Sequence, residues 1–248
     1  MMNHHFEDFT EGRYRGLLEL ARRNYRFIGY EDFKSEGRNI LWRHDVDMSA
    51  HRAFRLAEIE AEAGISATYF ILLHSSFYNP LEKTVADLVE GILGLGHRLG
   101  LHFDPGFYGL NINDLNGFQE ALLMEKNILE TVFKKEVRAF SFHDPDTGSW
   151  LNFEEDIFAG LINAYGAYFK SRYSYCSDSN GYWRFHRLSD LLEKAAAERL
   201  HILTHPAWWV PEAAAPRERV SRAIDGRAAF QHRFYDEFLA AHGRKNIK

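Results

Sequence analysis

Short apolar runs alternate along the chain with longer segments in which apolar residues recur every three or four positions. The short runs predict buried strands at residues 40–42, 67–73, 98–103, 137–142, 167–170 and 200–204. The periodic segments predict amphipathic helices at residues 14–25, 49–63, 85–95, 115–133, 153–165, 188–198 and 216–241. Strand and helix in alternation are typical of an α/β fold with a parallel sheet and helices packed outside it.

The segment that begins at Ser49 carries signals for both ends of its helix. Ser49 is a favourable residue for capping the N-terminus, and Gly64 suits the conformation in which helices commonly end. Between them Ala53, Leu56 and Ile59 fall on one face. This face is expected to be the buried one.

Composition narrows the class of protein. The chain has 248 residues, of which 46% are hydrophobic, and a formal net charge of −5. This length can bury a substantial core, and because no linker, low-complexity tract or internal repeat is evident, we expect a single domain over residues 1–248. The negative net charge offers no basic field for nucleic acid. The single cysteine, Cys176, excludes an intramolecular disulfide and a cysteine-only zinc site.

The first ten residues are polar and acidic, without the apolar stretch of a signal peptide. No apolar run approaches the roughly 18 residues of a membrane-spanning helix. We therefore expect a cytoplasmic protein without a membrane span.

Polar side chains gather where the predicted strands end. The residues at these exits are Asp45, Asp47, His74, His102, Asp104, His143, Asp144 and His205. In parallel barrels, functional groups collect where strands end and loops begin. We therefore expect several of these side chains to converge on one site.

The sequence Arg43-His44-Asp45-Val46-Asp47 is the most informative of these exits. Side chains two positions apart in a strand point the same way, so Asp45 and Asp47 share a face. Two like charges at the edge of a core are costly unless a metal ion or a shared proton compensates. With an imidazole from His102, the pair suits a zinc-like hydrolytic metal, one carboxylate binding the ion and the other accepting a proton from water. A solvated turn or a helix-capping pair is the alternative interpretation.

His205 follows an apolar strand and precedes Trp208 and Trp209. A histidine in this position can protonate a leaving group, and indole faces can stack on a sugar ring. The alternative is a buried histidine that bonds to the backbone beside tryptophans that fill the core. His143 also has two interpretations. It can contact a metal or orient the base, or it can simply belong to a proline turn with Asp144.

These motifs resemble those of the polysaccharide deacetylase (NodB-homology) superfamily over roughly residues 40–209. Residues 43–47 look like the first motif of the family, residues 96–102 like the approach to its second, and residues 203–205 like its last. The resemblance implies a distorted (β/α) barrel in which Asp45 is the catalytic base and His205 the general acid. It also implies a divalent metal cofactor, with zinc favoured, held by Asp47 and His102.

Two positions depart from the family pattern. The second motif usually has a further histidine four residues on, where this chain has Gly106. His143 would restore the ligand set as the third ligand, and Asp104 is the alternative. His143 itself stands where the family has an arginine that orients the base, and Arg184 is the candidate replacement. The residues expected to bind substrate or to orient catalytic groups are Arg43, Asp104, Arg184, Trp208 and Trp209.

The resemblance implies metal-dependent removal of an acetyl group from an N- or O-acetylated sugar or saccharide precursor. One alternative is hydrolysis of a non-sugar amide or of a glycosidic bond on the same scaffold. Another is a catalytically inactive carbohydrate-binding homologue, which Gly106 and His143 favour. The expected cytoplasmic location favours a precursor, such as a nucleotide- or lipid-linked sugar, as substrate.

Overall fold

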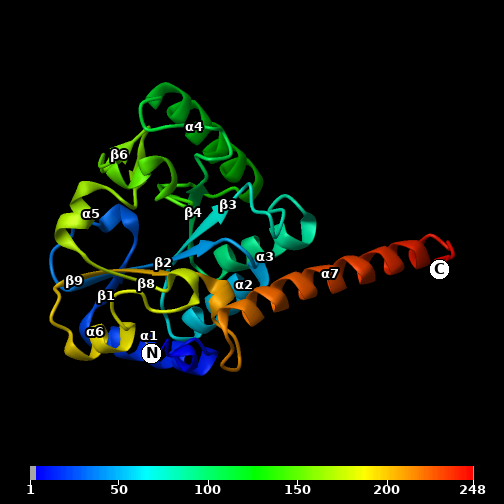
Figure 1. The fold of residues 1–248 in the computed structure, drawn as a ribbon, viewed down its shortest axis with the longest axis horizontal. Helices are drawn as coiled ribbons and strands as arrows, with labels where there is room; N and C mark the ends of the chain where they lie inside the picture. Colours follow the sequence, from blue (N-terminus) through cyan, green and yellow to red (C-terminus); the bar gives the residue numbers. More distant parts are fainter. Residues whose placement is uncertain (1–3, 248) are drawn as a thin grey trace.

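A computed structural model of the protein describes residues 4–247. Its strands form one curled sheet in the order β6-β7-β5-β4-β3-β2-β9-β8, and β1 also pairs with β2 (Figure 1). Neighbouring strands are parallel except for the antiparallel pair β6–β7. The strands are β1 (Arg26–Ile28), β2 (Asn39–Val46), β3 (Thr68–Leu72), β4 (Arg98–Phe103), β5 (Ala139–Phe142), β6 (Ile157–Phe158), β7 (Leu161–Asn163), β8 (Ser174–Ser177) and β9 (Arg199–Thr204).

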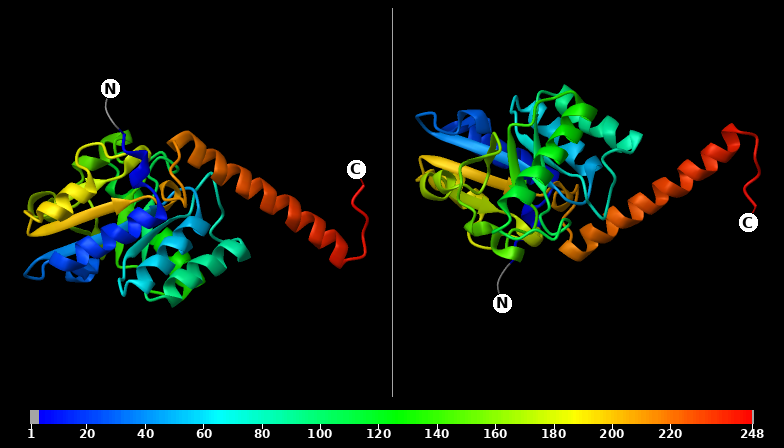
Figure 2. Two further views of the ribbon diagram at one scale, coloured as in Figure 1. Left: turned by 90° about the horizontal axis from the view of Figure 1, so that it is seen from below. Right: turned by 90° about the horizontal axis from the view of Figure 1, so that it is seen from above.

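Helices connect most of the strands and cover the outside of the sheet (Figures 1 and 2). They are α1 (Glu11–Asn24), α2 (Ala50–Glu62), α3 (Lys83–Gly94), α4 (Leu115–Phe133), α5 (Ala167–Arg172), α6 (Leu188–Lys194) and α7 (Pro216–Ala241). Short 3-10 segments are η1 (Phe6–Asp8), η2 (Tyr30–Asp32), η3 (Thr147–Asn152), η4 (Ser179–Gly181) and η5 (Pro206–Trp208). No helix within residues 4–247 combines the length and the apolar character needed to cross a membrane.

The central strand β2 is buried along its whole length and separates two apolar clusters. Ile40 and Trp42 point outwards into the large cluster between the sheet and the helices. Leu41 points the other way, into a smaller cluster inside the curl of the sheet that also contains Phe70 and Phe169. Because successive side chains of a strand alternate in direction, a strand buried on both faces reads as the continuous apolar run seen in the sequence.

Helix α5 helps to fill the opening between the two ends of the sheet. It follows β7 near one end and precedes β8 at the other. Phe169 of α5 packs inside the curl against Tyr30, and the ring of Tyr30 contacts Phe70 of β3. A parallel sheet that curls around an inner core confirms the predicted α/β fold and its distorted barrel.

Most predicted elements are confirmed, including the helix over residues 216–241. Ser49 caps α2 by accepting a hydrogen bond from the backbone N–H of Arg52. Gly64, with a φ of +67°, follows the end of that helix. The predicted helix at residues 188–198 is shorter, since α6 ends at Lys194.

Two predicted elements are wrong. Residues 153–165 do not form a helix but include the hairpin β6–β7, whose two-residue turn is Ala159-Gly160 with φ values of 50° and 80°. Such a turn matches the twist of the paired strands. Residues 167–170 are not a strand but the first turn of α5, where tertiary packing of Phe169 outweighs the strand propensity of its aromatic neighbours. The short strands β1 and β8 were not predicted.

The register of the sheet brings the predicted site residues to one edge. His44 on β2 is level with Thr204 on β9, so the next residues, Asp45 and His205, emerge side by side. His102 on β4 is level with Ser141 on β5. The carboxyl ends of these parallel strands therefore present their side chains to the same region.

Candidate metal centre

Asp47, His102 and His143 come together at this edge of the barrel. Asp47 Oδ1 lies 3.1 Å from His102 Nε2, which lies 3.4 Å from His143 Nδ1, and that atom lies 3.8 Å from Asp47 Oδ1. Ligands bound at zinc-like distances in a tetrahedron are about 3.3–3.6 Å apart. The triangle therefore has the size of one face of a tetrahedral site.

The donor set fits a divalent cation. Asp47 Oδ1 is buried and makes no hydrogen bond within the described part of the chain, although His102 Nε2 is close. Burial would raise the pKa of Asp47, but the contact with His102 and the charges of His205 and His143 lower it to about 2. An ionised carboxylate that faces two imidazole nitrogens offers the oxygen and nitrogen ligands that zinc accepts.

A hydroxyl group sets the orientation of His102. His102 Nδ1 lies 2.8 Å from Ser141 Oγ, which donates a hydrogen bond to Asp45 Oδ1 at 3.3 Å. Since the hydroxyl proton is directed at Asp45, the oxygen accepts from Nδ1–H, and His102 Nε2 is the ring atom that faces the triangle. Ser141 was not among the predicted site residues. Its position two residues before His143, on the same side of the strand, was the available signal.

Asp45 is buried beside the triangle and is held by Arg43. Arg43 Nη2 lies 3.3 Å from Asp45 Oδ2 and donates a hydrogen bond to Tyr165 Oη at 2.8 Å. Arg43 and Asp45 are two residues apart on the same face of β2, which explains their contact. Arg184, predicted as the candidate for this contact, is instead exposed, with its guanidinium 5.4 Å from the ring centroid of Phe185.

A buried carboxylate holds His205. His205 Nδ1 donates to Asp178 Oδ1 at 2.6 Å, and Trp209 Nε1 donates to Asp178 Oδ2 at 2.9 Å. Burial alone would lower the pKa of His205, but the hydrogen bond to Asp178 and the charge of Asp47 raise it to about 9. His205 Nε2 lies 3.7 Å from Asp47 Oδ2. His205 therefore carries a proton at neutral pH and presents it next to the triangle.

Asp178 was not among the predicted site residues. Its contact with His205 depends on the pairing of β8 with β9, which places Ser177 level with Leu203. The pattern of apolar residues does not predict that β8 and β9 pair with each other. The role of Asp178 could therefore not be derived from spacing.

The converging groups line a cavity of about 560 Å³. Asp45, Asp47, His102, His143 and His205 lie on its wall. The remaining wall includes Leu151, Tyr165, Tyr175, Asn180, Arg184, Phe185 and Trp208. The indole nitrogen of Trp208 is buried and has no hydrogen-bond partner among the described residues.

Three residues predicted to bind substrate or orient groups, Arg43, Asp104 and Trp209, are not on the cavity wall. Arg43 is completely buried and contacts Asp45. Asp104 Oδ1 accepts hydrogen bonds from the backbone N–H groups of Gly106 and Phe107, so it stabilises a turn. Trp209 is completely buried and packs against Phe9. Its ring is therefore not available to stack on a sugar, although its indole N–H helps to hold Asp178.

Comparison with known proteins found no matching family model and no matching curated protein. Among solved structures, the chain is similar to a family 4 carbohydrate esterase from Bacillus anthracis, with 17% identity, a TM-score of 0.43, and 87% and 86% of the two chains covered. It is also similar to the Streptococcus pyogenes deacetylase PplD in complex with acetate, with 13% identity, a TM-score of 0.40 and 85% of each chain covered. A CE4 family pseudoenzyme from Bacillus anthracis shows 12% identity and a TM-score of 0.41, with 77% of this chain and 61% of that chain covered.

Proposed function

We propose that the protein is a metal-dependent hydrolase of the polysaccharide deacetylase superfamily that removes an acetyl group from an N- or O-acetylated sugar. The observation that carries this proposal is the triangle of Asp47, His102 and His143. Asp45 lies beside one member of the triangle, with its Oδ2 3.8 Å from His102 Nδ1. His205 lies beside another, Asp47. A ligand triangle with one carboxylate and one imidazolium next to it is suited to hydrolysis of an acyl bond.

Asp47, His102 and His143 would hold the metal, and zinc is the ion that their donor types favour. A divalent ion held there would polarise the acetyl carbonyl and would make a water molecule more acidic. Every other step can be assigned to side chains. Asp45 accepts the proton of the attacking water, while Arg43 and Ser141 hold its carboxylate in place. His205 donates its Nε2 proton to the departing amine or alkoxide.

The cavity wall supports a sugar as the substrate. Trp208, Tyr165 and Tyr175 contribute aromatic surface to it, and aromatic faces pack well against the apolar face of a sugar ring. Arg184 and Asn180 on the same wall can bind hydroxyl or anionic groups. The cavity therefore combines flat apolar surface with polar groups that fix orientation, as sugar sites require.

The test combines elemental analysis of the purified protein with measurement of acetate release from a panel of acetylated sugars. The wild-type protein is expected to contain a divalent metal and to release acetate. Asp45→Asn should abolish turnover while the metal content stays unchanged, because Asp45 is not in the triangle. Undiminished acetate release by this variant would overturn the role of Asp45.

The same measurements separate the alternatives. Cleavage of glycosidic bonds by a metal-free, fully active preparation would assign the site to a glycosidase. Sugar binding without turnover, in a protein that retains no divalent metal, would assign it to an inactive binding homologue. Release of an acyl group from non-sugar amides alone would support the proposed hydrolytic chemistry but would exclude a sugar as the substrate.

A further inference from the structure

Helix α7 leaves the body of the protein and extends away from it (Figures 1 and 2). Its 26 residues correspond to a length of about 39 Å. From residue 228 to its end, its side chains are exposed or at most half-buried. Because most of the stability of a helix in a protein comes from packing of one face, a long helix without such packing indicates a missing neighbour.

The first turns of α7 are firmly attached, so its direction is set by the fold. The buried Arg219 donates hydrogen bonds to the carbonyl oxygens of Gly181 and Phe6, and its guanidinium lies 4.9 Å from the ring centroid of Phe9. Two turns later Arg227 pairs with Glu82 through both of its terminal nitrogens. The helix is thus held at its base while its outer half is presented to solvent.

An aromatic strip runs along this outer half. Phe230, Phe234, Phe238 and His242 follow one another at intervals of four residues, which places them on one face. Phe230 stacks on Phe234 and Phe238 contacts His242. Phe234 is 59% and Phe238 45% exposed. A row of exposed aromatic residues on one face of a helix indicates an interaction site, unlike exposed apolar residues that are scattered singly.

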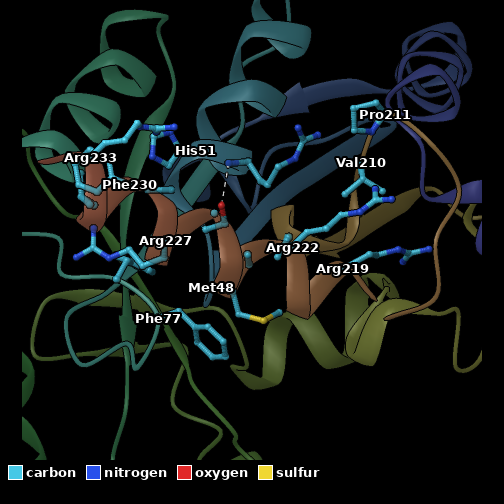
Figure 3. A pocket seen from close by; sticks show the side chains of 18 residues that line it. Met48, His51, Phe77, Val210, Pro211, Arg219, Arg222, Arg227, Phe230 and Arg233 are labelled. Carbon is cyan, nitrogen blue, oxygen red and sulfur yellow. Dashed lines mark hydrogen bonds between the residues drawn. The ribbon is translucent and has the colours of Figure 1, made fainter. Parts of the chain in front are cut away.

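The inner end of the same face borders a pocket of about 340 Å³ at the base of the helix (Figure 3). Met48, Phe77 and Phe230 contribute apolar surface to it, and Arg222 and Arg233 of α7 also line it. The aromatic strip and the pocket are therefore parts of one continuous surface. The surface is apolar along its middle and basic at its side.

We propose that this surface is covered by α7 of a second copy of the chain, running antiparallel to the first. In an antiparallel helix pair, the same flank of both helices meets. Glu237 lies on the flank that also carries Arg222, Gly226 and Arg233. With the two-fold axis near residues 229 and 230, Glu237 of each copy reaches the level of Arg222 of the other, which forms two opposite-charge contacts by symmetry.

This arrangement also covers the apolar surface. Phe234 and Phe238 of one copy come to the level of the pocket in the other copy. Near the two-fold axis, Phe230 of one copy lies at the level of Ala229 of the other, and the small side chains of Ala229 and Gly226 leave room for it. Both complementary parts, the aromatic strip and the pocket with its arginine flank, belong to the same chain, so a self-complementary dimer needs no further partner.

Sedimentation velocity of the full chain over a range of concentrations tests the proposal. The wild-type protein is expected to form a dimer. The double variant Phe234→Asp, Phe238→Asp should raise the dimer dissociation constant by roughly a hundredfold or more. The control, His232→Asp, introduces a negative charge on the opposite face of α7 and should leave the dimer intact. Circular dichroism of all variants checks that they fold.

A charge exchange gives a second, independent arm. Glu237→Arg should weaken the dimer, and Arg222→Glu in the same chain should restore it. A wild-type protein that stays monomeric would overturn the proposal, as would a dimer insensitive to Phe234 and Phe238. Binding of the monomer to anionic lipid vesicles in a manner that requires Phe234 would assign the strip to a membrane surface, and this result would also overturn it.

Discussion

Asp178 contacts His205 at two points, through the ring Nδ1 at 2.6 Å and through the backbone N–H at 3.0 Å from the same carboxylate oxygen. The backbone contact fixes the start of the loop, and the ring contact fixes the direction of the imidazole. Because Asp178 is completely buried, its negative charge acts on His205 with little screening. Asp178 therefore both orients the proposed general acid and stabilises its protonated form.

Replacing Asp178 with asparagine should disable the proposed acid. Asparagine keeps the size of the side chain but removes the charge that favours protonated His205. We expect acetate release to fall by roughly 10²–10⁴-fold, with metal content unchanged. The loss should increase with pH, because the pKa of His205, now about 9, moves towards its ordinary value and the alkaline limb of the pH–rate profile shifts to lower pH.

The matched control is Asp190→Asn, which removes a carboxylate from an exposed position on α6. Its pH–rate profile should coincide with that of the wild type. If Asp178→Asn lowered the rate equally at every pH, Asp178 would have a structural role only, and the assignment of His205 as acid would lose its support.

Ser141 is expected to matter for metal binding although it is not a proposed ligand. Ser141→Ala removes the hydroxyl that accepts from His102 Nδ1, so the imidazole is no longer held with Nε2 towards Asp47. A loss of about 10–100-fold in metal affinity is expected, measured by competition with a chelator. Ser141→Thr, which keeps the hydroxyl, should restore part of the affinity, whereas a buried hydroxyl without influence on the metal would give equal affinities for all three proteins.

His143 is the least buried member of the triangle, since a third of its side chain is exposed. His143→Ala should therefore leave the fold intact while the protein loses its bound metal and its activity. Metal added to the wild type should raise the melting temperature, because a ligand that binds the folded state stabilises it, and this rise should disappear in the variant. The exposed His186→Ala serves as control. An unchanged metal content in His143→Ala would point to a ligand set without it.

The sequence predicted which polar residues converge better than it predicted the groups that contact them. Asp47, His102 and His143 each follow an apolar run, so local pattern and the rules of parallel sheets are enough to bring them to one edge. The contact between Arg43 and Asp45 could also be inferred from their two-residue spacing. Asp178 and Ser141 act through contacts made across strands, and such contacts depend on strand order and register, which a single sequence does not reveal.

The errors in the fold have a similar cause. The apolar positions between Phe153 and Tyr165 have helical spacing. The segment nevertheless forms a hairpin, with a turn at Ala159-Gly160 and with Ile157 paired to Ile162. In the next segment, Phe169 gains more from burial inside the barrel than from strand pairing. Long periodic segments such as α4 and α7 were predicted correctly because their pattern repeats over many turns.

Glu125 on α4 is a buried carboxyl group apart from the candidate site. Its Oε1 accepts a hydrogen bond from Tyr108 Oη at 2.8 Å and lies 3.0 Å from His74 Nε2, while its Oε2 has no partner in the described residues. Burial and the charge of Asp104 raise the pKa of Glu125, while the hydrogen bond from Tyr108 and the charge of His102 lower it, and the net result is a pKa of about 7. Glu125 therefore takes up a proton more readily in the folded than in the unfolded chain.

This shift predicts how the stability of the protein depends on pH. Because the folded-state pKa lies above the ordinary value of 4.5, the stability linked to Glu125 is greatest below about pH 4.5 and is lost as the pH rises through about 7. Glu125→Gln, which cannot ionise, should be more stable than the wild type above about pH 7, by roughly 1–3 kcal/mol. The difference should shrink at low pH. Urea unfolding at several pH values measures it, with the exposed Glu120→Gln on the same helix as control. A pH-independent difference would show that the pKa of Glu125 is the same in the folded and the unfolded chain.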